Sequence, residues 1–124
     1  MTVEEKIVDI KENISKITTY THQNQDTKNS GFPSVCLHNG VLYGASRSGS
    51  SHSSNDGIIE IYEVKTNRII RKIENSSYDL RDPFLYEYNG YLYCNTFGRL
   101  STDTSQRKSF IYNVETGSLI RTID

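Results

Sequence analysis

The chain has 124 residues, a formal net charge of −1 and an apolar content of 35%, which is lean for a single domain. Its Lys and Arg residues are dispersed, so neither a nucleic acid nor an anionic membrane is indicated as a partner. No apolar run approaches the length of a membrane helix, and we expect no signal peptide because the N-terminus has no apolar core.

The first predicted unit is a heptad helix over residues 1–21. Its apolar residues alternate spacings of four and three, as on the seam of a coiled coil. These residues are Val3, Ile7, Ile10, Ile14 and Ile17. Thr2 and Glu5 form a capping box at its start. Because Ile at both seam positions favours three or more strands, we predict a short oligomeric stem. The alternative is an amphipathic helix docked on its own domain.

Residues 22–31 form a predicted polar linker. No aliphatic residue occurs from Thr21 to Gly31, so the stretch is typical of an extended connector. His22 lies in it, and we expect that side chain to be solvated. A connector of this kind favours the coiled coil over the docked helix.

Residues 32–124 contain one pattern written twice, in predicted units 32–74 and 82–124. The second copy follows the first by fifty residues without a gap, so that Asn39-Gly40 recurs as Asn89-Gly90. These dipeptides are strong hairpin signals. Each copy divides into four short predicted strands: 32–38, 40–46, 57–64 and 68–73, then 83–88, 91–97, 109–114 and 118–123. Four strands per repeat of about fifty residues is typical of a β-propeller blade.

The predicted fold is mainly β, with two four-stranded propeller blades preceded by an N-terminal coiled-coil helix. Ile59, Ile61 and Val64 alternate with Glu60 and Glu63, which predicts a strand with one buried face. Two blades cannot close a ring, since propellers have about four to eight. Three chains would supply six blades, and the Ile-rich seam favours three strands. We therefore expect a six-bladed propeller closed by a homotrimer.

The cysteines and the remaining polar spacings indicate no cofactor. Cys36 and Cys94 do not occupy equivalent repeat positions, and each lies in a predicted strand. We interpret them as two buried thiols rather than a disulfide. No metal-ligand spacing, phosphate-binding loop or nucleophile–base pattern occurs, so we expect neither a metal nor a cofactor.

Two motifs carry a resemblance to a known family. The first repeat contains Arg47, Gly49, Ser51, His52, Asp56 and Gly57, and the second opens on Asp79, Leu80, Arg81, Asp82 and Pro83. Over residues 31–99 this pattern resembles the opening blades of sialidase-like six-bladed propellers, which implies a sugar-directed site. Phe32 stands where that family has an arginine, and the repeat turns lack its Asp-box residues. The late blades that carry the family's Tyr-Glu nucleophile have no counterpart in this sequence.

Five residues are candidates for ligand binding: Arg47, His52, Asp56, Arg81 and Asp82. Arg47 ends a predicted strand and is the best placed to meet an anion or a sugar. Asp56 is either a general acid or an ordinary turn residue before a glycine. Arg81 and Asp82 bind ligand or simply pair with each other and the backbone. His52 binds ligand or faces solvent. No catalytic residue is assigned; for an enzyme, Asp56 and Asp82 would be the candidates.

The predicted architecture also resembles the receptor-binding and fibre proteins on tails of phages of Gram-positive bacteria, at the level of fold analogy. Our leading hypothesis is a non-enzymatic, homotrimeric module that binds a cell-wall glycan or another virion protein, located in a virion or the cytoplasm. We expect no nucleic acid and no membrane as partners. The alternative is a fragment of a sialidase-like exo-glycosidase. A structural adaptor that binds only protein is a third hypothesis.

Overall fold

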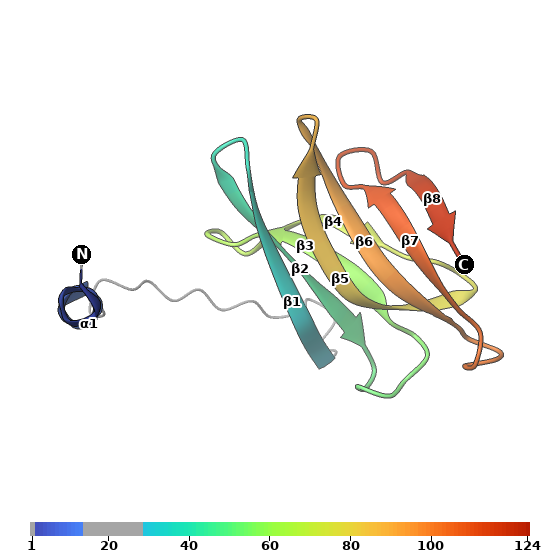
Figure 1. The fold of residues 1–124 in the computed structure, drawn as a ribbon. Coiled ribbons are helices and arrows are strands. Elements are labelled where there is room, and N and C mark those ends of the chain that lie inside the picture. Colours follow the sequence, from blue (N-terminus) through green and yellow to red (C-terminus); the bar gives the residue numbers. More distant parts are fainter. Residues whose placement is uncertain (1, 14–28) are drawn as a thin grey trace.

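The computed structural model describes residues 2–13 and 29–124, which form one helix and eight strands (Figure 1). They are α1 (Val3–Asn13), β1 (Asn29–His38), β2 (Val41–Gly49), β3 (Ile58–Glu63), β4 (Arg68–Ile73), β5 (Tyr78–Tyr88), β6 (Tyr91–Leu100), β7 (Arg107–Asn113) and β8 (Leu119–Ile123). The strands form two antiparallel sheets, β1-β2-β3-β4 and β5-β6-β7-β8. The mainly β class and the four strands per repeat are confirmed.

The helix begins where its cap predicts. The Thr2 Oγ1 accepts a hydrogen bond from the Glu5 N–H at 3.1 Å, which satisfies one unpaired donor of the first turn. Val3, Ile7 and Val8 are exposed, so these apolar side chains are not buried against the sheets. The seam positions Ile14 and Ile17 and residues 22–28 of the predicted linker, with His22, lie outside the described residues. The coiled-coil stem stays a prediction.

The two repeats turn in the same way. Asn39 and Gly40 have φ values of 49° and 76°, and Asn89 and Gly90 have 49° and 82°. Two successive residues with positive φ make the type I′ turn, whose twist matches that of the strands it joins. The two hairpins that the Asn-Gly pairs predict are confirmed.

Several strands extend beyond the predicted limits. β1 begins at Asn29, inside the predicted linker, and there it pairs with Gly49 at the end of β2. In the second sheet Tyr78 pairs with Leu100 in the same way. The polar side chains at these ends carry no alternation that marks a strand. Pairing with the neighbouring strand satisfies the backbone groups there and prolongs both strands.

Each first strand also has an irregularity at its proline. The register shifts between Gly31 and Ser34 in β1 and between Arg81 and Phe84 in β5, fifty residues apart. A bulge accommodates Pro because the position needs no donor to the ladder. In β5 the bulge places Asp82 at a φ of 49°.

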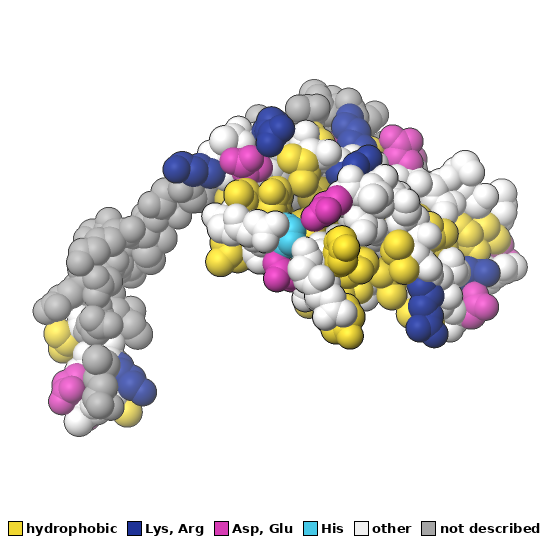
Figure 2. Space-filling view, turned by 90° about the horizontal axis from the view of Figure 1, so that it is seen from above, with side chains coloured by type: hydrophobic (Ala, Val, Ile, Leu, Met, Phe, Trp, Pro, Cys, Tyr) yellow, Lys and Arg dark blue, Asp and Glu magenta, His cyan; other side chains and the backbone are white. Residues whose placement is uncertain are grey.

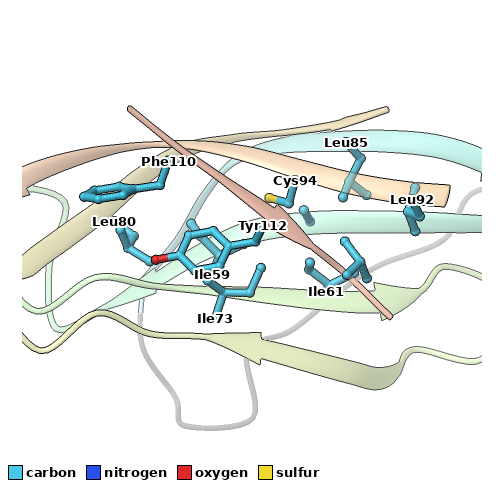
Figure 3. Packing of buried hydrophobic residues seen from close by; sticks show 11 residues of the cluster. Ile59, Ile61, Ile73, Leu80, Leu85, Leu92, Cys94, Phe110 and Tyr112 are labelled. Atoms are coloured by element: carbon cyan, nitrogen blue, oxygen red, sulfur yellow. The ribbon is translucent and has the colours of Figure 1, made fainter. Parts of the chain in front are cut away.

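The hydrophobic core lies between the two sheets (Figure 3). It contains Ala45, Ile59, Ile61 and Ile73 from the first sheet and Leu80, Leu85, Leu92, Cys94, Phe110, Tyr112 and Val114 from the second. Ile61 is in the core, but its repeat equivalent Ile111 lies between the core residues Phe110 and Tyr112 and so points to the other face of its sheet. The sheets therefore pack front to back, each presenting a different face to the other.

The predicted one-sided burial of β3 is wrong. Glu60 is fully buried, as are Ile59 and Ile61 on the opposite face of the same strand. A strand covered on both faces needs no alternation between polar and apolar residues. Both cysteines are free thiols; Cys94 is buried and Cys36 is partly exposed. Burial raises the pKa of the Cys94 thiol to about 12, which keeps it protonated and unreactive.

Candidate functional site

One buried carboxylate, that of Asp79, collects three arginines at the junction of the sheets. Arg47 Nη2 donates to Asp79 Oδ1 at 3.0 Å, and Arg81 Nε donates to Oδ2 at 2.6 Å. Arg99 Nη2 lies 3.3 Å from Oδ2. The Gly57 N–H adds a hydrogen bond to Oδ1 at 2.7 Å. Asp79 is fully buried and the Arg47 side chain is 4% exposed, so this cluster, the arginine hub, is internal.

The same three arginines hold the β2–β3 loop. The Ser54 carbonyl accepts hydrogen bonds from Arg47 Nη2, Arg81 Nη2 and Arg99 Nη2 at 2.9, 2.7 and 3.3 Å. Arg81 Nη1 also donates to the His52 carbonyl at 2.9 Å. Because a guanidinium presents several donors in a fixed plane, the loop is fixed to the second sheet by groups that cannot lose their charge.

Asp56 fixes the loop from within. Its carboxylate accepts hydrogen bonds from the Ser50 N–H at 3.0 Å and from the hydroxyls of Ser50 and Ser54. The hydroxyl bond from Ser50 is the largest of the effects that lower the pKa of Asp56 well below its usual range. An acid catalyst needs a proton to give near neutral pH, so Asp56 is suited to holding the loop rather than to donating a proton.

Beside this loop lies a polar groove of about 260 Å³. Its described lining residues are Asn55, Asp56, Gly57, Ile58, Glu74, Asn75, Ser76, Tyr78 and Ser101. Asn55 is held by Arg99, whose Nη2 donates to Asn55 Oδ1 at 2.6 Å. The Tyr78 ring packs edge-on against Phe110, with ring centroids 5.1 Å apart. The groove therefore has one wall fixed by the arginine hub and another fixed by the core.

The open polar groups of this groove lie on the β4–β5 connection. Within the described part of the chain, the Glu74 carboxylate and the Ser76 hydroxyl make no hydrogen bond or ion pair. Asn75 Oδ1 accepts from the Ser77 N–H at 3.0 Å, which orients the carboxamide. Together with Asn55, Asp56 and Tyr78, these residues supply the polar and aromatic groups of the depression, which we call the polar groove. It offers carboxylates, carboxamides and hydroxyls beside an aromatic ring.

Asp82 is placed elsewhere. It is exposed on the β5 bulge and lines an open depression of about 480 Å³ with Pro33, Ser34, Pro83 and Phe84. The Ser34 hydroxyl oxygen accepts a hydrogen bond from the Leu85 N–H at 3.0 Å, which ties β1 to β5 there. Asp56 and Asp82, the two carboxylates considered for catalysis, thus line different depressions.

The structure brings four of the five sequence candidates around one loop. Arg47 and Arg81 hold it, His52 supplies a carbonyl, and Asp56 fixes it internally. Asp82 does not join them. Arg47 was expected at a mouth facing ligand, whereas its side chain is buried and its terminal nitrogens donate to Asp79 and to carbonyls of the loop. Sequence reasoning missed Arg99, whose position in the first repeat is a glycine, so the repeat gave no signal for it.

A second polar cluster joins the hairpin end of the first sheet to the second sheet. Buried His38 contacts Glu87 through Nδ1 and Glu115 through Nε2, the latter at 3.3 Å. The hydrogen bond to Glu87 is the main cause that raises the pKa of His38, against the effect of burial. Figure 2 looks onto this end and shows a histidine between acidic side chains. The sequence gave no spacing that would identify this cluster.

In the described ranges, no group of three or more His, Cys, Asp or Glu residues could hold a metal ion. No helix in those ranges is long and apolar enough to cross a membrane. The fold and the two clusters define a mainly β protein with one internal sheet-to-sheet junction. No protein-family model, curated protein or solved structure matches the chain.

Proposed function

We propose that the chain is a non-enzymatic binding module that takes a neutral or amino-bearing glycan in the polar groove. One observation carries this proposal: the groove is preorganised, because its loop wall is fixed by three arginines before any ligand arrives. Preorganised groups lose little conformational entropy on binding, so more of the interaction energy appears as affinity. A groove of about 260 Å³ suits roughly one sugar unit, since pockets for larger ligands span about 300–1,000 Å³.

The charge of the groove favours a glycan without acidic groups. Its described lining includes Asp56 and Glu74 but no lysine or arginine. The guanidinium groups of the nearby hub are engaged by Asp79 and by loop carbonyls. A sialic or uronic acid would meet like charge there, whereas sugar hydroxyls and ammonium groups suit carboxylate acceptors.

Binding rather than hydrolysis is supported by the separation of the two candidate acids. A glycosidase flanks one scissile bond with two carboxyl groups. Asp56 and Asp82 line different depressions, and the pKa of Asp56 is lowered rather than raised. We therefore favour the binding module over the sialidase-like alternative.

We extend the proposal to a homotrimer whose chains each contribute two propeller blades, engaging a cell-wall glycan or another virion protein as part of a phage tail. Two features support the assembly: the front-to-back packing of the repeats, and the exposed apolar residues Val3 and Ile7 of α1. Head-to-tail contacts of this kind close into a ring where the rotation from one copy to the next allows it.

The test is a panel of neutral, amino-bearing and acidic oligosaccharides, printed as an array and followed by calorimetry on the best binder. We expect neutral or amino-bearing members to bind and acidic ones not to. Replacing Glu74 by Ala should weaken binding about 10- to 100-fold, the loss of one hydrogen bond to a charged group.

The matched control is Asp124→Ala. Asp124 occupies the same place in the second repeat, is 84% exposed and pairs only with the half-exposed Lys108. This variant should bind like the native chain. Preference for the acidic oligosaccharides, or equal loss in both variants, would exclude the polar groove as the site.

A further inference from the structure

The contact between the two sheets inside the chain indicates how the outer faces of the sheets could contact another molecule. Because the repeats pack front to back, the second sheet has an outer face equivalent to the covered face of the first. The first sheet likewise has an outer face equivalent to the covered face of the second. Both outer faces carry exposed apolar side chains near the Asn-Gly hairpins, where Figure 2 shows hydrophobic groups gathered.

Burial at equivalent positions shows the two half-interfaces. On one side, His38 is 4% exposed while its equivalent Tyr88 is 63% exposed, and Ile73 is 3% while Ile123 is 44%. On the other side, Leu92 is 1% exposed while its equivalent Leu42 is 39%. Val35 and Leu37 are exposed beside Leu42. At these three positions the covered residue therefore has an apolar or aromatic counterpart that is more exposed on the outer face.

The contacts of the internal junction identify which groups should meet. His38 of the first sheet reaches Glu87 and Glu115 of the second. Fifty residues earlier, the positions of Glu87 and Glu115 hold Leu37 and Lys65. Those two residues line a depression of about 240 Å³ on the first sheet, with Gly40, Val41, Leu42, Glu63 and Val64. We name it the hairpin groove.

On both sides of the contact, the side chains inside the chain differ in chemistry from their repeat equivalents on the outer faces. Internally, a histidine that can carry a proton meets two carboxylates. Outwardly, the equivalent residues are an aromatic ring, Tyr88, and a groove lined by aliphatic groups, the stem of Lys65 and Glu63, whose carboxylate pairs with Arg68. The ring would bury apolar area against the aliphatic groups, while its hydroxyl faces the Lys65 ammonium.

An arginine repeats this correspondence. In the internal junction Arg71 Nε donates to the Val114 carbonyl at 3.0 Å, and its Nη2 donates to the Glu115 carbonyl. Its equivalent Arg121 is exposed and makes no hydrogen bond or ion pair within the described part of the chain. In a second copy it would find the carbonyls of Val64 and Lys65.

We propose that the outer face of the second sheet docks a second copy of this chain, with Tyr88 entering the hairpin groove of that copy. Stacked rings support Tyr88's side of the contact: Phe84, Tyr86 and Tyr93 form a row with centroids 6.1 and 5.6 Å apart. The contact lies at the hairpin end, because Ser46, Ser48 and Glu60 farther along the first sheet are already buried in the chain.

The contact joins unlike surfaces, so it can be tested by directional crosslinking. In the full chain with Cys36→Ala, one preparation carries Tyr88→Cys and another carries Leu37→Cys. Mixed under mild oxidation, the two should give covalent heterodimer. The matched control pairs Tyr88→Cys with Leu119→Cys. Leu119 is similarly exposed but pairs with the core residue Tyr112, which places it away from the outer face of the sheet. We expect at least about tenfold more heterodimer than in this control, the ratio that ~1.4 kcal/mol of contact energy gives.

Two outcomes would overturn the proposal. Equal crosslinking of Tyr88→Cys with itself would mean a face-to-face contact of two second sheets. No excess over the Leu119→Cys control would mean that the hairpin groove does not receive this residue. The contact rests on the proposed assembly of chains and specifies its interface, so either outcome would also remove that interface from the proposed ring. Neither outcome depends on whether the polar groove binds a glycan, so the glycan proposal and the docking proposal fail separately.

Discussion

Asp79 is the residue on which the junction depends most. It is fully buried, and the four donors around it come from β2, from the residue just before β3, from β5 and from β6. A buried ion pair gives little net stability over a well-packed apolar alternative, but removing one partner leaves the others buried and uncompensated. The cost of a substitution therefore falls on the arginines that remain.

We predict that Asp79→Ala lowers the free energy of unfolding by about 3–5 kcal/mol, the range for breaking a buried pair. Urea denaturation followed by circular dichroism measures it. The control is Glu74→Ala, which removes an exposed carboxylate that makes no hydrogen bond or ion pair within the described part of the chain and should change stability by no more than about 0.5 kcal/mol. Equal effects in the two variants would contradict the role assigned to Asp79.

Sequence reasoning found the polar residues of the junction but not their roles. The motif positions Arg47 and Arg81 were singled out, and the structure brings them together. The orientation of Arg47 could not be predicted, because its partner Asp79 lies in the other repeat and meets it through packing. Arg81 pairs with Asp79 two residues before it in β5, a local spacing to which sequence reasoning gave no role. Arg99 and Glu74 escaped notice for a related reason: neither belongs to a local motif.

Among the elements, the β1–β2 hairpin shows how the sheets are held together at the end opposite the hub. Its last strand residue, His38, reaches two carboxylates of the second sheet, Glu87 and Glu115, which are about half exposed. Asn39 Nδ2 lies 3.3 Å from its Nε2, and the Tyr43 ring lies beside it. The hairpin is thus fixed by a contact whose strength depends on the charge of one imidazole.

This dependence sets a pH window. The folded-state pKa of His38 is raised, chiefly by the hydrogen bond to Glu87, above the value of about 6.5 for an unfolded chain. The contact therefore contributes its full stability below pH ~6.5 and loses it as pH rises through the raised folded-state pKa. We expect the melting temperature to fall over that interval in the native chain and to change less in His38→Gln. An identical fall in both would assign the effect to other groups.

Most of the strands and turns could be predicted from the sequence. The Asn-Gly pairs predicted both hairpins because φ > 0 at successive positions is required there, and β4 has the predicted limits. The ends of β1, β2, β5 and β6 were missed, since they are prolonged by pairing and not by side-chain pattern. Burial of Glu60 was also missed, because alternation along one strand does not report what covers its second face.

In the whole molecule, a single chain leaves apolar side chains exposed both on its sheets and on α1. Val3 and Ile7 of α1 are exposed and lie on the predicted seam, while Val8 is equally exposed and lies off it. Comparing Ile7 with Val8 therefore distinguishes a seam between chains from apolar side chains that are merely exposed.

We predict that Ile7→Asp raises the concentration needed for assembly, because an uncompensated carboxylate in a seam costs about 3–5 kcal/mol. Val8 is next to Ile7 and similarly exposed but lies off the seam, so Val8→Asp should leave assembly unchanged. Light scattering over a dilution series measures both. If the two variants assemble alike, the helix does not join the chains.

The arginine hub has a consequence for how the molecule is degraded. The β2–β3 loop holds four serines between Ser50 and Ser54, a composition in which proteases usually find their first cut. Here the carbonyls of Ser51, His52, Ser53 and Ser54 each accept hydrogen bonds from guanidinium groups, two of which come from the other sheet. A protease needs the loop extended, and extending it breaks the sheet-to-sheet junction. Nicking at this loop should therefore occur only as fast as the sheets separate, which makes its cut site a reporter of global opening rather than of local fraying.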